Sequence, residues 1–395
     1  MQRTAAARTM AQARRILKRM DVQGVEWGGI REEQRTALRR ILEERMYSLI
    51  GNRIAQLDVE GVPDRRNGYY PRQLLTVIGA VELMVPRART FSAVGVLEAY
   101  GRRERDVNRL ILAAFLLGLS TRKVGEALLT ILGERVSAST VSRVAQGLDE
   151  SVAAFHRRRL LRRYRVLVLD GVVLSRRTGA GALRRPVLVA LGITPEGRKE
   201  VIDFRLAQSE SQVEWERFLN DLYRRGLAGE DLELIVTDGG SGLLAALPVV
   251  FPEIPVQRCW AHKTRNILDK VRQMDRERAK RDLHRISHAT DRTEARRAAR
   301  RFADRWEERY PAAVRCLRQD LDELLEFLRF REVDWRTAAR TTNAIERRFR
   351  EVRRRTRPMG VFSDRTSMER ILFAVFSYEN QKAGTSAPFL LTHTT

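Results

Sequence analysis

Two stretches of the chain, RVLVLDG at residues 165–171 and LELIVTDG at residues 232–239, share one pattern: an apolar run that ends in Asp-Gly. Such runs predict strands that are buried on both faces. In an open α/β sheet, ligands gather outside the carboxyl ends of the strands. Asp170 and Asp238 are therefore expected at the functional edge, close together if their strands are adjacent. Asp-Gly is also an ordinary turn signal, but its repetition favours the functional interpretation.

The segments around these stretches predict the rest of an α/β domain. Ser211 and Glu214 have the spacing of a capping box, which opens a helix. The predicted elements are, in order, a strand at 165–171, a hairpin at 186–193 and 200–206, a helix to about Arg225 that stops at Gly226, a strand at 232–239, a short helix to Pro248, a strand at 256–260 and helices from His262 onward. This order predicts an α/β fold with a mixed sheet.

The first part of the chain predicts a different, mostly helical region. Apolar residues have helical spacing through residues 11–57, whereas Leu75 to Val85 alternate loosely and predict a short hairpin. Two short helices follow at about 121–131 and 138–148, with Ser137 or Ser139 placed to cap the second. This is the pattern of a helix-turn-helix, whose second helix would present Ser139, Thr140 and Arg143 to DNA. A plain helical hairpin has the same pattern.

The charge of the chain indicates a polyanionic partner. Among 395 residues there are 74 basic and 50 acidic side chains, a net charge of +24, and nucleic acid is the leading candidate for the partner. Most of the basic residues are Arg, the side chain best suited to phosphate contacts. A GC-rich genome, which favours Arg codons, would also explain this excess. Residues 165–262 are almost neutral between two basic flanks, and residues 340–357 hold eight Arg against Glu346 and Glu351. Phosphate contact would explain that density, and so would a solvated helix face.

Several classes of protein are excluded. Cys259 and Cys316 are the two cysteines, too few for a disulfide-stapled secreted domain or for a zinc finger. Cys259 with His262 supplies two zinc ligands, fewer than a zinc site needs. The basic N-terminus lacks the apolar core of an export signal, and no run approaches the thickness of a bilayer. A cytoplasmic protein that does not enter the membrane is expected.

A third carboxylate would complete a metal site with Asp170 and Asp238. Mg²⁺ prefers one or two carboxylates together with phosphate oxygens and water, and two-metal phosphoryl transfer normally uses a third acid. The helix expected from Thr341 carries Glu346 in its first turn, with Ile345, Phe349 and Val352 as the sheet-facing stripe. Glu351 is expected to pair with Arg355 instead.

The motifs VLVLDG (166–171), IVTDG (235–239), QRCWAHKTRN (257–266) and TNAIER (342–347) resemble those of the bacterial mutator-type insertion-sequence transposases. The resemblance implies an RNase-H-like catalytic domain with an Asp-Asp-Glu triad, here Asp170, Asp238 and Glu346, which would bind two Mg²⁺ ions, with Mn²⁺ as a substitute. It also implies a helical insertion before the glutamate, and residues 263–335 have the unbroken helical pattern expected of one.

The expected function is therefore that of a DNA transposase, which binds the terminal inverted repeats of an insertion sequence, cleaves strands and joins the 3′-hydroxyl ends to target DNA. Two ends must be held together, so a homodimer on double-stranded DNA is expected, associated with the nucleoid. Residues expected to border the active site are Cys259, Trp260, His262 and Asn343. Residues expected to contact DNA, besides those of the helix-turn-helix, are Lys263, Arg265, Arg347, Arg348, Arg350, Arg353 and Arg354.

The expected domain organisation has six segments, namely an N-terminal helical region with a hairpin (1–105), a helix-turn-helix-like region (106–155), the first part of the catalytic core (156–262), the insertion (263–335), the last core helices (336–380) and a tail (381–395). Two other functions share part of the pattern. A non-catalytic DNA-binding regulator would explain the charge but not the paired Asp-terminated strands. A junction resolvase or other RNase-H-like nuclease would explain the carboxylates but not the large helical insertion.

Overall fold

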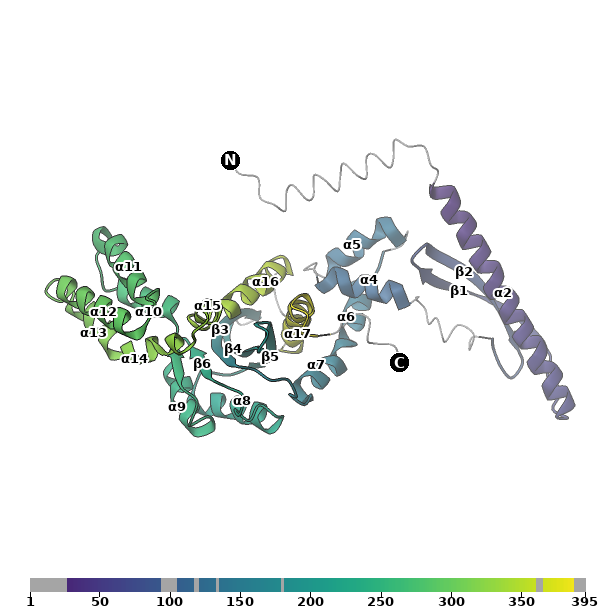
Figure 1. Cartoon of the computed structure of the whole chain (residues 1–395). Coiled ribbons are helices and arrows are strands. Elements are labelled where there is room, and N and C mark those ends of the chain that lie inside the picture. The colour runs from purple at the N-terminus through teal and green to yellow at the C-terminus, as the bar shows by residue number, and fades with distance from the viewer. Residues whose placement is uncertain are drawn as a thin grey trace. The chain divides into compact units, whose positions relative to one another are not determined.

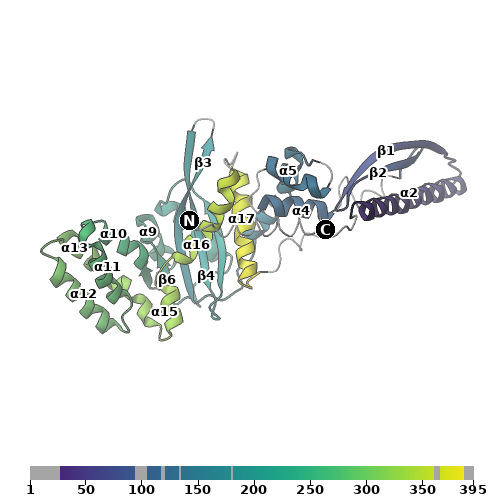
Figure 2. The same cartoon turned by 90° about the horizontal axis from the view of Figure 1, so that it is seen from above.

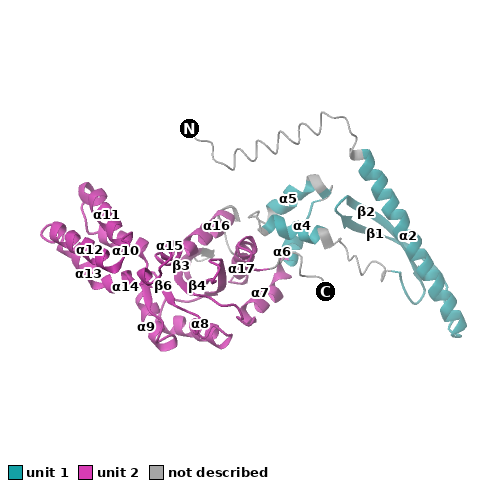
Figure 3. Cartoon of the chain, in the orientation of Figure 1, with its two compact units in different colours: residues 1–115, 121–144 teal, residues 116–120, 145–395 magenta. Residues whose placement is uncertain are grey.

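The computed structural model describes residues 27–93, 105–116, 121–132, 135–178, 181–359 and 365–386. The chain divides into two compact units, one of residues 1–115 and 121–144 and the other of residues 116–120 and 145–395 (Figure 3). The six predicted segments are finer than this division, and their boundaries remain predictions. In the described part of the chain, no helix is both long enough and apolar enough to cross a membrane.

The first unit contains the predicted helix and hairpin. Helix α2 (Trp27–Val59) packs against β1 (Arg66–Thr76) and β2 (Gly79–Ala88), which are antiparallel (Figure 1). Their shared core contains Leu42, Met46 and Ile50 from the helix and Leu74, Leu83 and Val85 from the strands. The hairpin was predicted from Leu75 to Val85, but β2 continues to Ala88. Residues 11–26, which were also predicted to be helical, lie outside the described ranges.

Three helices follow, α4 (Arg105–Leu116), α5 (Thr121–Leu132) and α6 (Ala138–Gln146). Helices α5 and α6 are the pair predicted as a helix-turn-helix. The Ser137 hydroxyl accepts a hydrogen bond from the Thr140 N–H at 3.1 Å, so Ser137 caps α6. The turn passes close to α5, because a Cβ on Gly125 would lie 2.1 Å from the Val136 carbonyl oxygen. The helices are confirmed; their contact with DNA remains a prediction.

The second unit is built on a five-stranded mixed sheet with the order β5-β4-β3-β6-β7. The strands are β3 (Val166–Thr178), β4 (Gly181–Ile193), β5 (Lys199–Leu206), β6 (Leu234–Thr237) and β7 (Val256–Arg258). Strands β3, β4 and β5 are antiparallel neighbours, whereas β6 and β7 run parallel to β3. The sequence therefore predicted the strand positions and the mixed character of the sheet correctly.

Helices cover both faces of this sheet (Figures 1 and 2). Helices α8 (Gln212–Arg224) and α9 (Ser241–Val250) pack on the face that carries Leu167 and Leu169. Because side chains alternate along a strand, Val168 and Asp170 lie on the opposite face, where α16 (Asn343–Met359) contacts β3 and α17 (Arg365–Lys382) contacts β5. The predicted capping is present, since the Ser211 side chain accepts a hydrogen bond from the Glu214 N–H.

Three predicted boundaries are wrong. Asp170 lies inside β3 rather than at its end, because β4 continues to pair with β3 as far as Thr178. Helix α9 continues through Pro248 to Val250. The strand predicted at 256–260 ends at Arg258, because Cys259 is the N-cap residue of α10 (Trp260–Leu268).

The stretch between β7 and α16 is helical, as predicted for an insertion. It contains α10 followed by α11 (Gln273–Ser287), α12 (Arg292–Trp306), α13 (Pro311–Gln319), α14 (Leu321–Leu324), a 3-10 helix (Glu326–Arg329) and α15 (Val333–Ala339). The core of this bundle contains Phe302 and Trp306, both buried. Sequence spacing alone sufficed to predict this part of the fold.

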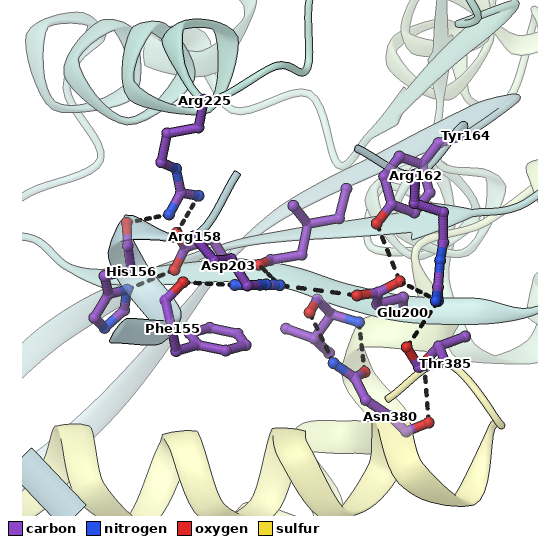
Figure 4. A network of polar contacts seen from close by, with 12 residues as sticks. Phe155, His156, Arg158, Arg162, Tyr164, Glu200, Asp203, Arg225, Asn380 and Thr385 are labelled. Carbon is purple, nitrogen blue, oxygen red and sulfur yellow. Dashed lines mark hydrogen bonds and ion pairs between the residues drawn. The ribbon is translucent and has the colours of Figure 1, made fainter. Parts of the chain in front are cut away.

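A polar network secures the edge strand β5 (Figure 4). The buried Asp203 carboxylate binds His156 of α7 (Leu148–Arg157) at 2.6 Å and also pairs with Arg225. Asn380 of α17 accepts a hydrogen bond from the Val201 N–H at 2.7 Å and donates one to the Val201 carbonyl at 2.9 Å. These bonds satisfy backbone groups that an edge strand would otherwise leave unpaired, and they hold α17 against the sheet.

Candidate active site

The strand register brings Asp170 and Asp238 to the same level of the sheet. The parallel ladder between β3 and β6 ends with Leu169 opposite Thr237. The next residue in β3 is Asp170, and the residue that follows β6 is Asp238. Asp170 is buried, with 3% of its surface exposed. Asp238 begins a turn, in which its Oδ1 accepts a hydrogen bond from the Gly240 N–H at 3.0 Å. The two carboxylates therefore lie side by side although 67 residues separate them in the sequence.

Glu346 reaches this edge because the start of α16 is tied to the end of β7. The Thr342 N–H donates a hydrogen bond to the Cys259 sulfur at 3.3 Å, and the Trp260 N–H donates one to the Arg340 carbonyl at 3.1 Å. Helix α16 begins immediately afterwards, at Asn343. Cys259 is thus a buried anchor for the segment that carries Glu346, a role that the sequence did not reveal.

Asp170 and Glu346 line one cleft with a volume of about 480 Å³. His262 also lines it, and its Nε2 lies 3.7 Å from Glu346 Oε1. Three arginines complete the charged part of the wall: Arg265, Arg350 and Arg353. The cleft therefore combines acidic groups at the sheet edge with basic groups from α10 and α16. Val172, Val173 and Phe349 form its apolar part.

Burial and like charge perturb the groups of this cleft. Burial, followed by the charge of Asp238, raises the pKa of Asp170 to about 7. The neighbouring Cys259 side chain raises the pKa of His262 to about 9, and the charges of Asp170 and Asp238 act in the same direction. Burial alone would raise the pKa of the Cys259 thiol, but its contacts with His262 and Thr342 lower it. A protonated His262 therefore offsets part of the negative charge at neutral pH.

A glycine follows each aspartate, and another side chain packs closely on each glycine. A Cβ on Gly171 would lie 2.6 Å from Cδ of the Glu210 carboxylate, so this carboxylate packs directly on the Gly171 backbone. Gly239 has a φ of +92°, and a Cβ there would lie 2.2 Å from the Arg258 guanidinium group. Arg258 in turn pairs with Asp320 at 3.4 Å. Glu210 is a charged neighbour of the site that sequence analysis missed.

The residues present suit a divalent cation of the magnesium type. Among the described residues, no group of three or more His, Cys, Asp or Glu side chains is assembled closely enough to hold a metal ion unaided. Mg²⁺ does not require such a cage, because it keeps several waters and uses one or two carboxylates together with substrate phosphates. A buried aspartate whose ionisation is opposed by a neighbouring aspartate fits such an ion, since a cation between the two would remove the repulsion.

The other residues predicted at the active site or in contact with DNA differ in their burial and in their partners. Arg347 is exposed on α16, and Arg354 pairs with Glu351 at 2.8 Å. Glu351 also binds Arg355 at 2.7 Å, as predicted. Trp260 is buried, and its indole N–H donates a hydrogen bond to the Leu324 carbonyl at 2.7 Å. In the first unit, Ser139 and Arg143 are exposed, whereas Thr140 is partly buried.

Two residues predicted to contact DNA are buried. Lys263 is buried and its ammonium group pairs with Asp320 of the insertion, because Lys263 lies on the same helix face as the buried Ile267. Arg348 is also buried and donates to the Ala344 carbonyl at 2.9 Å and to the Lys199 carbonyl at 3.3 Å. Both side chains are engaged within the protein, and their contact with DNA remains a prediction.

These features define an α/β protein with an acidic cleft flanked by arginines. The model of the family described as "Transposase, Mutator family" matches residues 2–383, and the chain belongs to this family. The chain is 31% identical to the transposase for insertion sequence element IS905 of Lactococcus lactis, over 88% of each chain. It is 32% identical to the transposase for element ISRM5 of Rhizobium meliloti, over 89% of this chain and 88% of the relative.

A further relative is the transposase for element IS406 of Burkholderia multivorans, which is 34% identical over 80% of this chain and 81% of the relative. Among solved structures, the Drosophila P element transposase strand transfer complex matches 71% of this chain and 79% of that chain, with 11% identity and a TM-score of 0.31. That structural similarity is too low to identify the fold by itself. The sequence matches support the predicted family.

Proposed function

We propose that this transposase binds the terminal inverted repeats of its insertion sequence, cleaves the strands there and transfers the 3′-hydroxyl ends into target DNA, with Asp170, Asp238 and Glu346 as the catalytic triad. One observation carries the proposal. The register of β3 and β6 aligns the two aspartates, and α16 brings Glu346 to the cleft that Asp170 lines. Asp170 thus has two acidic neighbours from distant parts of the sequence, Asp238 by strand register and Glu346 at the cleft.

We also propose that the catalytic domain is RNase-H-like. Three antiparallel strands are followed by two parallel strands, and the first strand lies at the centre of the sheet. Asp170 is on the central strand β3, and Asp238 follows the neighbouring parallel strand β6. Glu346 is on α16, a helix that packs on one face of the sheet. The helices between β7 and α16 then form an insertion that leaves this order unchanged.

In the proposed reaction, the three carboxylates would hold two Mg²⁺ ions, for which Mn²⁺ could substitute. When bound, such ions activate the attacking oxygen and stabilise the leaving oxygen of an in-line phosphoryl transfer. The protein itself orients the carboxylates through the β3–β6 register and the contact between Cys259 and Thr342. Its arginines in the cleft bind the phosphates beside the scissile bond, and the apolar Val172, Val173 and Phe349 limit the access of water.

DNA binding would use two surfaces of the chain. At the cleft, Arg265, Arg350 and Arg353 are exposed and lie beside the carboxylates. Arg347 and Arg354 on the same helix would extend this basic surface along the duplex. In the first unit, α6 would present Ser139, Thr140 and Arg143 to the terminal repeats. A homodimer on the DNA would hold the two ends together.

The proposal is tested with the DNA that flanks the coding sequence of this element. Purified protein, labelled end fragments and a target plasmid are incubated with Mg²⁺ or with EDTA, and joined products are separated on a gel. Joining is expected only with the divalent ion. Asp170→Asn, Asp238→Asn and Glu346→Gln are expected to bind the ends but not to cleave or join them, whereas Asp269→Asn, an exposed control at the end of α10, should join normally.

The same assay separates the alternative functions. Hydrolysis of the ends without joining would indicate a nuclease. Binding of the ends without any strand cleavage would indicate a regulator. A triad variant that still joins strands would remove that residue from the proposed catalytic set.

A further inference from the structure

Glu210 lies at the candidate active site although it belongs to none of the four sequence motifs that resemble the transposase family. It precedes α8 directly, in the segment that follows β5. Its carboxylate packs over Gly171, where an added Cβ would lie 2.6 to 2.9 Å from its Cδ and both oxygens. Gly171 is the residue after Asp170, so Glu210 covers the backbone immediately beside the buried aspartate.

The other side of this carboxylate faces the Asp238 turn. A Cβ on Gly240 would lie 3.6 Å from Asp238 Oδ1 and 3.9 Å from Glu210 Oε2. The carboxylates of Glu210 and Asp238 therefore border the same small space, at the carboxyl end of β6 and beside Gly171 of β3. Because each would repel the other when ionised, this arrangement is unfavourable unless a cation is shared.

The backbone of Glu210 is held firmly in this position. A Cβ on Gly242 would lie 2.0 Å from the Glu210 carbonyl oxygen, so the first turn of α9 packs directly on it. The next residue, Ser211, caps α8. The side chain, in contrast, has no hydrogen bond or ion pair with any other described residue. A half-buried carboxylate on a rigid backbone thus lies beside Asp238 without a protein partner.

We infer that Glu210 is a fourth acidic residue of the active site and that it helps to hold the divalent cation together with Asp170 and Asp238. This inference rests on the proposed function. It accounts for the lack of a protein partner at Glu210 and for the position of its carboxylate beside that of Asp238. It adds to the triad a residue from the α8 side of the sheet, opposite the helix that carries Glu346.

A purely structural role makes the opposite prediction. Glu210 lies near the first turns of α8 and α9, where a negative charge can stabilise the helix ends. In that case its neutralisation should lower the stability of the metal-free protein and leave cation binding unchanged. If Glu210 is instead a cation ligand, its neutralisation removes repulsion between acids in the metal-free protein and weakens the binding of the cation.

The test compares Glu210→Gln with Glu230→Gln, an exposed control in the loop after α8, in the full-length protein. Mn²⁺ is titrated by calorimetry, and melting temperatures are measured in EDTA. We expect Glu210→Gln to weaken Mn²⁺ binding about tenfold or more without lowering the metal-free melting temperature, while Glu230→Gln matches the wild type. Unchanged Mn²⁺ affinity, or a lower metal-free melting temperature than the control, would overturn the inference.

Asp170→Asn in the same titration separates this inference from the proposed function. If Asp170→Asn abolishes Mn²⁺ binding and Glu210→Gln does not weaken it, the triad stands and Glu210 is not part of the site. If Asp170→Asn binds Mn²⁺ like the wild type, the proposed metal site is wrong, and the inference about Glu210 is overturned with it.

Discussion

Replacing Asp170 by Asn should stabilise the metal-free protein, and by more at high pH. The pKa of Asp170 is raised from 3.8 to about 7, chiefly by burial and then by Asp238. A raised pKa means that the folded state binds the proton more tightly than the unfolded state does. Ionisation of Asp170 therefore opposes folding, and the stability of the wild type falls as the pH rises from about 4 to 7.

The size of this effect follows from the two pKa values. Each tenfold change in proton affinity is worth about 1.4 kcal/mol, so ionised Asp170 costs the folded state on the order of 4 kcal/mol above pH 7, and almost nothing below pH 4. Asparagine has nearly the same shape and no charge. For a unit of this size, about 4 kcal/mol corresponds to a rise of roughly 8 °C or more in melting temperature.

The assay is thermal unfolding in EDTA at pH 5 and pH 8, for the wild type, Asp170→Asn and the exposed control Asp269→Asn. The advantage of Asp170→Asn over the wild type should be clearly larger at pH 8. Added Mg²⁺ should raise the melting temperature of the wild type and leave Asp170→Asn unchanged. A variant that melts below the wild type at pH 8, or whose advantage does not depend on pH, would refute the argument from burial and like charge.

Three other predictions concern residues around the site. The double variant Arg350→Ala/Arg353→Ala should reduce the magnitude of the slope of log DNA affinity against log salt concentration by about 2, because each phosphate contact contributes about 0.9. An unchanged slope would mean that DNA does not contact these two arginines. Lys263→Met should destabilise the protein by about 3 kcal/mol, because it leaves the buried Asp320 carboxylate beside fewer cations. The salt dependence of its DNA affinity should match that of the wild type. A weaker salt dependence would indicate that Lys263 contacts DNA. Asn380→Ala should lower the free energy of unfolding, measured in urea, by about 3 kcal/mol, because the backbone N–H and carbonyl of Val201 both lose their partner. A loss below about 1 kcal/mol would mean that the edge of β5 does not depend on α17.

The sequence predicted those parts of the fold that local patterns determine. Apolar runs located β3 and β6, and the Ser211 cap located the start of α8. The length of β3 was missed, because the residues after Val173 are largely polar and Arg-rich, and only their pairing with β4 extends the strand. The end of β7 was missed for a similar reason, since Cys259 and Trp260 are apolar in sequence but begin a helix.

The triad could be proposed from sequence because each acid stands at a recognisable position: two follow buried runs and one lies in the first turn of a helix. Helical spacing could also have predicted the burial of Lys263 and Arg348. Lys263 shares a face with Ile267, and Arg348 lies beside Ile345 and Phe349 on the sheet-facing side of α16. Glu210 could not be found in this way, because its proximity to Gly171 depends on how β5, α8 and α9 meet in space.

A structure of the protein bound to its end DNA and Mn²⁺ would test the convergence of the three acids most directly. Anomalous scattering would locate the ions without assumptions about the ligands. We predict peaks in contact with oxygens of Asp170, Asp238 and Glu346, at about 2.1 Å, and with the scissile phosphate. Ions bound elsewhere, or a Glu346 that remains turned away from them with DNA in place, would contradict the proposed active site.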